Sequence, residues 1–465
     1  MADNFLIQEI NSEFLKIKNS LSSMYFKQWN DPELPMMENN SSKRLSNWLK
    51  RNNFLIKNGI YKIPTAFKAT YKTSNNVPNI CILAEYDALP GLANESVPKK
   101  KPTDQISGHG CGHNHIGPTN IAAAIIASKV SKKLNIPANI TVLGCPAEEI
   151  LWGKIALFNA GAFSNIDCIL TSHGDYQNGS ISRPCQSVIA GEIIFEGVSS
   201  HSGKINNLNS LLAAENFINS AKKIIQSKYP DILFRHIIRK AGLIPTITPD
   251  ETRVWFATRG FDFDKNKKSY KHILNLAKIL SKKNKTSYTH QIISETRGYL
   301  PNHILGKELY NSLKIFGPPK WSNKDLSFMQ KLVNQLIPGK KMTLDKKINF
   351  YNQGKDFYGQ DDGEVSWRIP LGRLNWAYPE EIPIHHWAWT ALSGNRASYQ
   401  GPFMVAKSLS HSIINLLKNP EIISKSKKEL DKRTKGIKLL NPNLGAFKTL
   451  TKKPELFWSA NWYEI

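Results

Sequence analysis

The sequence has few cysteines and no long uninterrupted apolar run, and both absences narrow the class of protein. Its five cysteines in 465 residues are too few and too scattered for a framework of disulfides. No stretch reaches the roughly 18 apolar residues that a membrane-spanning helix needs. The N-terminal residues also lack the pattern of a secretory signal. We therefore expect reduced thiols, a cytoplasmic location and no membrane partner.

Acidic residues are also scarce relative to basic ones. The chain has 62 Lys and Arg against 37 Asp and Glu, which gives a formal net charge of +25. Such an excess raises the question whether the protein binds nucleic acid, because clustered basic side chains release counterions from phosphates. Here the excess is mainly lysine and is spread along the chain, without a zinc finger, an aromatic RNA-binding pair or an arginine-rich arm. We expect a solvated lysine surface and no specific nucleic-acid partner.

Length and hydrophobic content predict a globular protein of more than one domain. The chain exceeds the roughly 150 residues of one typical domain, and 41% of its residues are hydrophobic. Apolar runs at 79–88, 139–149 and 167–175 are typical of strands buried on both faces, and a helical pattern at 120–134 follows Pro118. This alternation predicts an α/β domain with a mostly parallel sheet between helices.

The pattern changes near residue 190 and indicates an insertion. Residues 191–202 and 252–260 are strand-like, whereas 207–227 and 267–283 have helical patterns. We expect a smaller α+β, ferredoxin-like domain inserted into the main one. The predicted parts are the first part of the main domain (1–188), the inserted domain (189–296), the second part of the main domain (297–420) and a C-terminal tail (421–465).

Reactive side chains stand at the carboxyl end of each of the three apolar runs. Glu85 and Asp87 end the first run, adjacent Glu148 and Glu149 end the second, and His173 stands near the end of the third. In open α/β sheets, ligands bind outside the carboxyl ends of the strands. The sequence therefore predicts that these groups converge at one edge of the sheet.

A short loop, GHGCGHNH at residues 108–115, adds soft ligands to this edge. The glycines beside Cys111 and His113 permit a sharp backbone path that turns both side chains toward one point. Thiolate, imidazole and carboxylate are ligands of Zn²⁺, with Mn²⁺ or Co²⁺ as alternatives. With the late pair His385 and His386, five or six ligands are at hand, enough for two ions about 3.5–4 Å apart.

Together these motifs resemble a known family, the co-catalytic metallopeptidases and amidohydrolases that include aminoacylases, glutamate-releasing carboxypeptidases and auxin-conjugate hydrolases. The branch of p-aminobenzoyl-glutamate hydrolase and β-alanyl-lysine dipeptidase is the most similar. The resemblance covers about residues 35 to 415. The matching stretches are IPTAFKATY (63–71), ILAEYDALPG (82–91), GHGCGHN (108–114), GCPAEE (144–149), FEGVSSHS (195–202), GQDDGEVSW (359–367) and the HHW that ends at 387.

The resemblance implies roles for individual residues. Glu148 would be the general base, and Asp87 would support a metal-bound side chain. His201 would reach the active site of a partner subunit, so that the inserted domain would also form a homodimer. The ligands of two divalent ions, Zn or Mn with Co as a further option, would be Cys111, His113, Glu149, His173 and His385.

The implied chemistry is hydrolysis of an amide by metal-activated water, with an N-acyl amino acid, a p-aminobenzoyl-glutamate-like conjugate or a dipeptide as the small-molecule substrate. Arg259 is a candidate partner for a substrate carboxylate, although a structural ion pair is an equal alternative. Thr246 stands where relatives have an asparagine near the substrate. The alternative hypotheses are a β-alanyl-type dipeptidase and a binding or regulatory protein that has kept the scaffold without turnover.

Overall fold

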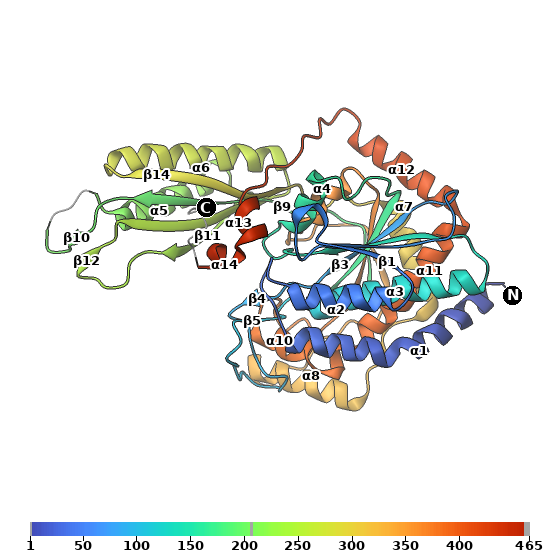
Figure 1. Ribbon diagram of the computed structural model, residues 1–465. Coiled ribbons are helices and arrows are strands. Elements are labelled where there is room, and N and C mark those ends of the chain that lie inside the picture. Colours follow the sequence, from blue (N-terminus) through green and yellow to red (C-terminus); the bar gives the residue numbers. More distant parts are fainter. Residues whose placement is uncertain (1, 205–207, 460–465) are drawn as a thin grey trace.

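The computed structural model describes residues 2–204 and 208–459 and is built around an eight-stranded mixed sheet (Figure 1). Its four central strands, β6, β3, β7 and β16, run parallel to one another. The predicted α/β class is therefore confirmed. In order across the sheet, the strands are β1 (Leu55–Asn58), β2 (Phe67–Lys72), β6 (Asn139–Cys145), β3 (Ile80–Glu85), β7 (Cys168–Asp175), β16 (Leu371–Ala377), β8 (Gly179–Ile181) and β15 (Asn349–Tyr351).

Strand β3 shows why the apolar runs are continuous. Ile80 and Ile82 pack into one hydrophobic cluster, while Cys81 and Leu83 pack into a second cluster on the opposite face. Both faces of the sheet are therefore buried. The first cluster includes side chains of α1 (Ala2–Asn30), α2 (Asn39–Lys50), α3 (His113–Lys133), α7 (His303–Phe316), α8 (Asn323–Leu336) and α11 (Gln400–Lys418). The second includes α4 (Gly153–Asn159) and α9 (Asp362–Ser366).

Helix α3 begins earlier than the sequence indicates. We expect its start near Pro118, but the helix begins at His113 and contains Pro118. Gly112 precedes it with a left-handed φ of 79°, which turns the chain into the first helical turn. Pro118 removes only one hydrogen bond near the helix start and does not end the helix. Consequently His113 and His115 belong to the helix, not to the loop.

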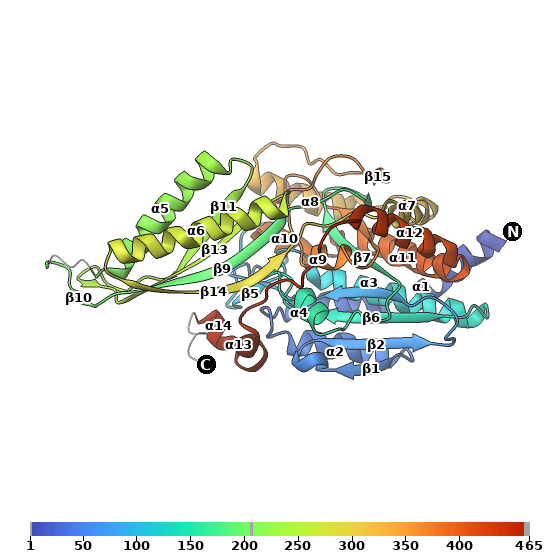
Figure 2. The same cartoon turned by 90° about the horizontal axis from the view of Figure 1, so that it is seen from above.

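A second, antiparallel sheet of four strands projects from the main sheet (Figures 1 and 2). The order is β11 (Leu233–Lys240), β13 (Glu251–Gly260), β9 (Ser187–Glu196) and β14 (Ser287–Thr296). Helices α5 (Ser210–Lys228) and α6 (Phe263–Lys283) cover one face, where Val254 and Phe256 are buried. Beyond its end lies the short pair β10 (Ser200–His201) and β12 (Ile247–Thr248).

The C-terminal tail returns across both sheets after α12 (Pro420–Thr434). The indole N–H of Trp152, near the main sheet, donates to the carbonyl of Gly445 at 2.8 Å. Phe457 lies in α14 (Pro454–Trp458) and packs edge-on against Trp255 of the second sheet, with ring centroids 5.4 Å apart. The tail, with α13 (Phe447–Lys452), thus connects the main sheet to the second sheet.

The remaining elements are short connections. They are the strand pair β4 (Leu89–Pro90) and β5 (Ser107–Gly108), helix α10 (Trp387–Ser393), and the 3-10 turns at Ile60–Lys62 and Arg396–Ser398. Within the described ranges, no helix has both the length and the apolar character needed to cross a bilayer.

Candidate metal centre

The predicted ligands converge at the carboxyl ends of β3, β6 and β7. Their donor atoms form three groups in which all members lie within 4.8 Å of one another. The groups share members, because His113, at the start of α3, and Cys111 each belong to two of them. The groups are Cys111, His113 and His173; Cys111, Glu149 and His385; and His113, Glu148 and Glu149.

Two of the three imidazoles in the cluster, those of His113 and His173, have one nitrogen fixed by a hydrogen bond. Nδ1 of His113 donates to Oδ1 of Asp87 at 2.9 Å, and Nδ1 of His173 donates to the carbonyl of Gly174 at 2.6 Å. In both rings the Nε2 atom therefore carries the free lone pair, and this atom faces the cluster. Nε2 of His173 lies 3.5 Å from Sγ of Cys111. A carboxylate behind a histidine in this way orients the ring as a metal ligand.

Several polar atoms in this cluster are buried and have no hydrogen-bond partner in the described part of the chain. They are Nε2 of His113 and one carboxylate oxygen each of Glu85, Glu148 and Glu149. Leaving such atoms unsatisfied costs free energy. Thiol, imidazole and carboxylate are also the ligands that Zn²⁺ and related ions bind. The residues therefore fit a pair of divalent cations.

The two adjacent glutamates have different surroundings. Oε2 of Glu149 lies 3.4 Å from Nε2 of His385, and the backbone N–H of Glu149 donates to Asp87 at 2.9 Å. Burial raises the pKa of both carboxyl groups; the carboxylate of Glu85 raises the pKa of Glu148 further, whereas His385 acts to lower the pKa of Glu149. A raised pKa suits a group that takes up and returns a proton near neutral pH.

The backbone of His385 is strained, a feature that the sequence could not have shown. Its φ of 61° lies in the left-handed region that residues other than glycine rarely adopt. Its N–H donates to the carbonyl of Gly110 at 2.9 Å, which ties this late loop to the loop of Cys111. Such conformations are concentrated at functional sites. His386 instead caps α10, accepting a hydrogen bond from the N–H of Ala388.

Sequence reasoning missed a buried lysine beside the cluster. Nζ of Lys154 lies 2.8 Å from Glu85 and 2.5 Å from Asp361, and all three side chains are fully or almost fully buried. Burial alone would raise the pKa of Glu85, but Lys154 lowers it to about 2. Glu85 therefore stays ionised, with its free oxygen 3.8 Å from Nε2 of His113. Asp361 lies within the matched stretch GQDDGEVSW, which was the available signal.

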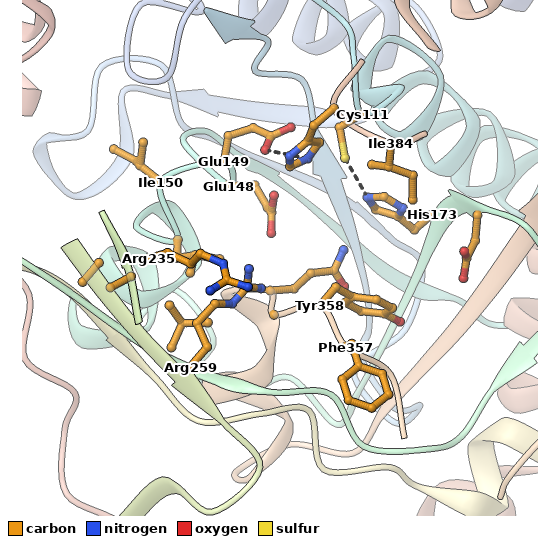
Figure 3. A pocket seen from close by; sticks show the side chains of 18 of the residues that line it. Cys111, Glu148, Glu149, Ile150, His173, Arg235, Arg259, Phe357, Tyr358 and Ile384 are labelled. Atoms are coloured by element: carbon orange, nitrogen blue, oxygen red, sulfur yellow. Dashed lines mark hydrogen bonds and ion pairs between the residues drawn. The ribbon is translucent and has the colours of Figure 1, made fainter. Parts of the chain in front are cut away.

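A cavity of about 430 Å³ opens beside this cluster (Figure 3). His173 of β7 borders it, together with loop residues near the same edge of the main sheet, Cys111, Glu148, Glu149 and His385. The second sheet supplies the opposite wall, including Arg259, which the sequence singled out, and Arg235, which it did not. Trp255, Phe357 and Ile384 add apolar surface.

The structure does not bring His201 or Thr246 to this cavity. Both side chains are exposed, and they lie in or beside the pair β10 and β12, at the far end of the second sheet. The two are neighbours, since the N–H of Ser202 donates to the carbonyl of Thr246 at 3.0 Å.

The fold was compared with family models and with solved structures of known proteins. No family model matches the chain. A peptidase from Bacillus subtilis, described as a dinuclear metal-binding member of the M20 family, superposes with a TM-score of 0.56 at 16% identity and covers 88% of this chain and 99% of its own. The fold is therefore that of the dinuclear metal-binding peptidases.

Sequence relatives have hydrolase names. A chain of the p-aminobenzoyl-glutamate hydrolase of Escherichia coli (strain K12) is 24% identical over 441 residues, which cover 86% of this chain and 90% of that protein. The Xaa-Arg dipeptidase of Homo sapiens is 30% identical over 247 residues, which cover 50% of this chain and 53% of that protein. The chain is a homologue of these two hydrolases, and the family resemblance of its motifs is confirmed.

Proposed function

We propose that the protein is a metal-dependent amidohydrolase that cleaves the amide bond of an N-acyl amino acid, an aminobenzoyl-glutamate-like conjugate or a dipeptide. The observation that carries this proposal is the set of three overlapping ligand groups with buried, unpartnered donor atoms, open to one cavity. The named activities of the two homologues support the same reaction class.

Five side chains are the proposed ligands of two divalent ions, Zn²⁺ or Mn²⁺, with Co²⁺ as a further option. When bound, such a pair supplies a water with a lowered pKa and polarises a carbonyl group. Asp87 holds the ring of His113 in place. The proposed ligands are Cys111, His113, Glu149, His173 and His385.

Glu148 is the proposed general base. Its carboxylate belongs to the third ligand group, with His113 and Glu149, and borders the cavity. In this role it would take a proton from the attacking water at a carboxylate oxygen and return it to the nitrogen of the leaving amine. Glu148 is only 5% exposed, which supports the assignment because burial tunes a carboxyl group toward proton transfer near neutral pH. Arg259, across the cavity, is the proposed partner of a substrate carboxylate.

We also propose that residues 189–296 form a lid that makes a homodimer, within the domain boundaries predicted from the sequence. The edge strand β11 exposes Ile237 and Ile238, and the following turn exposes Leu243 and Ile244, which supports burial against a second copy. A second copy could then supply His201 and Thr246 to the cavity, with His201 stabilising the developing oxyanion. Five free, buried cysteines support the proposed cytoplasmic location.

Elemental analysis and turnover assays test the proposed function. Purified protein should contain about two equivalents of metal per chain, and hydrolysis of a panel of N-acyl amino acids, p-aminobenzoyl-glutamate and β-alanyl dipeptides should stop with a chelator and return with Mn²⁺ or Zn²⁺. Preference for the β-alanyl dipeptides would favour the dipeptidase alternative. Metal without turnover of any amide would favour a binding or regulatory protein on this scaffold.

A further inference from the structure

The loop that carries Glu148 and Glu149 is a tight turn with a strained backbone. Ala147 has a φ of 57° and Leu151 a φ of 55°, both in the left-handed region that residues other than glycine rarely adopt. The N–H of Leu151 donates to the carbonyl of Glu148 at 2.7 Å, which closes the turn. Such backbone conformations cost free energy and persist only where surrounding contacts hold them.

Glu38, which directly precedes α2, holds this turn from outside the cavity. Its Oε1 atom accepts the N–H of Ala147 at 2.9 Å and the N–H of Met36 at 2.8 Å. Met36 is also left-handed, with a φ of 67°. One carboxyl oxygen thus holds two strained residues, of which Ala147 is 109 residues away from Glu38 in the sequence. Both Glu38 and Ala147 are fully buried, so bulk water cannot replace the contact between them.

A second carboxylate holds the same turn two residues further on. Asp87 accepts the N–H of Glu149 at 2.9 Å, so the backbone is fixed on each side of Glu148. Figure 3 shows the carboxylate of Glu148 pointing into the cavity. Asp87 also orients a proposed ligand, whereas the side-chain hydrogen bonds of Glu38 to the residues that the structure describes go to Met36 and Ala147 alone. The contact of Glu38 is therefore directed at the residue next to Glu148.

We propose that Glu38 is a positioning residue for Glu148, because it accepts the N–H of Ala147 and so keeps the general base directed into the cavity. This inference rests on the proposed function and adds to it a residue that does not border the cavity. Burial, and after it the carboxylate of Asp87, raise the pKa of Glu38 to about 8. The role thus needs an acceptor oxygen and no negative charge.

Two substitutions at Glu38 test the proposal on the Mn²⁺-loaded protein. Glu38→Leu removes the acceptor, and kcat should fall by about 10- to 100-fold, the usual cost of losing the support of a catalytic group. KM and metal content should stay at the wild-type level, because Asp87 still holds Glu149. Glu38→Gln keeps an acceptor oxygen, and its kcat should stay near the wild-type value. An unchanged kcat in Glu38→Leu, equal falls in both variants, or a loss of metal that accounts for the lower rate would overturn the proposal.

A double variant separates positioning from general damage to the structure. Protein with Glu148→Gln has no base to position, so adding Glu38→Leu should lower its residual rate no further. A further fall by the same factor would overturn the proposal. Glu33→Leu is the matched control, since Glu33 lies in the same segment but accepts the N–H groups of Asn40 and Ser41 at the start of α2. This variant should lower the melting temperature and keep the wild-type kcat, and a fall in kcat equal to that of Glu38→Leu would overturn the proposal.

Hydrogen exchange tests the contact without turnover. In the wild-type protein the N–H of Ala147 should exchange slowly, and Glu38→Leu should accelerate its exchange while Glu38→Gln does not. Rapid exchange of this N–H in the wild-type protein would overturn the proposal whether or not the variants fold. No hydrolysis of any amide by the wild-type protein would instead contradict the proposed function, whereas the exchange rates still show whether Glu38 holds the turn.

Discussion

Nδ1 of His113 donates a hydrogen bond of 2.9 Å to Oδ1 of Asp87, and both side chains are fully buried. The other oxygen of Asp87 accepts from the backbone N–H of Glu149 at 2.9 Å. One carboxylate thus orients two of the proposed ligands without taking part in the ligand groups.

Asp87→Asn tests this positioning. The amide cannot accept at both oxygen positions, so the ring of His113 or the backbone of Glu149 loses its partner. We expect the affinity for metal to fall by about 10- to 100-fold, the usual cost of losing such a supporting group. Competition with a chromophoric chelator measures it. An unchanged metal affinity would contradict the role given to Asp87.

Glu148→Gln should separate metal binding from turnover. The glutamine keeps the shape of the side chain but cannot accept the proton, so kcat should fall by about 10²- to 10⁴-fold. Metal content should stay at the wild-type level, because the five proposed ligands are intact. Glu215→Gln, an exposed position on α5, is the control for loss of one negative charge. Full activity of the Glu148 variant would refute its assignment as the base.

The sequence predicted the parts of the fold that depend on local pattern. The buried strands at Ile80–Glu85, Asn139–Cys145 and Cys168–Asp175 lie where continuous apolar runs placed them, because both faces of the sheet are covered. The expected convergence of Glu149 and His173 at one edge followed from the rule that sites form at the carboxyl ends of such strands, whereas the choice of Cys111, His113 and His385 as ligands depended on the family resemblance.

The missed features depend on contacts between distant parts of the chain. Lys154 is identifiable only through its partner Asp361, which is 207 residues away in the sequence. Arg235 faces the cavity because of the register between β11 and β13, which an alternating pattern on one strand does not fix. The path of the tail depends on Gly445, where a Cβ would lie 1.7 Å from the carbonyl oxygen of Ile292.

Lys154→Met should destabilise the protein strongly. It would leave Glu85 and Asp361 buried without the ammonium group that now lies between them. Breaking a buried ion pair from one side costs about 3–5 kcal/mol, and urea unfolding of the metal-free protein measures it. Lys101→Met is the control, since its pair with Glu95 is about half exposed and worth under about 1 kcal/mol. Equal effects of the two substitutions would contradict the importance of burial.

Phe457→Ala tests the connection that the tail makes between the two sheets. Phe457 is fully buried and packs against Trp255, which borders the cavity. We expect faster hydrogen exchange in α13, α14 and β13, with exchange in β3 and β6 unchanged, and a higher KM at an unchanged kcat. Leu440→Ala, at an exposed position of the same tail, is the matched control. Unchanged exchange in β13 would show that the tail does not support this wall.

His290 makes the stability of the second sheet depend on pH. Burial lowers the pKa of His290 to about 4, and its Nε2 is hydrogen-bonded to the hydroxyl of Tyr270 at 2.8 Å. In the unfolded chain the group titrates near pH 6.5. Between these values the unfolded state binds the proton and the folded state does not, so stability falls as the pH decreases from about 6.5 to 4.

The substitution His290→Asn removes this titrating group and therefore its contribution to the pH dependence of stability. Over that window the wild-type protein should lose up to about 3 kcal/mol more of its free energy of unfolding than the variant, because one pKa unit corresponds to about 1.4 kcal/mol. Urea unfolding at several pH values measures both. His272→Asn, on the neighbouring helix α6, is the comparison, since its ring contacts Tyr229 and not the buried Tyr270. Parallel stability curves for wild type and His290→Asn would mean that the buried ring accepts a proton in the folded state as readily as in the unfolded one.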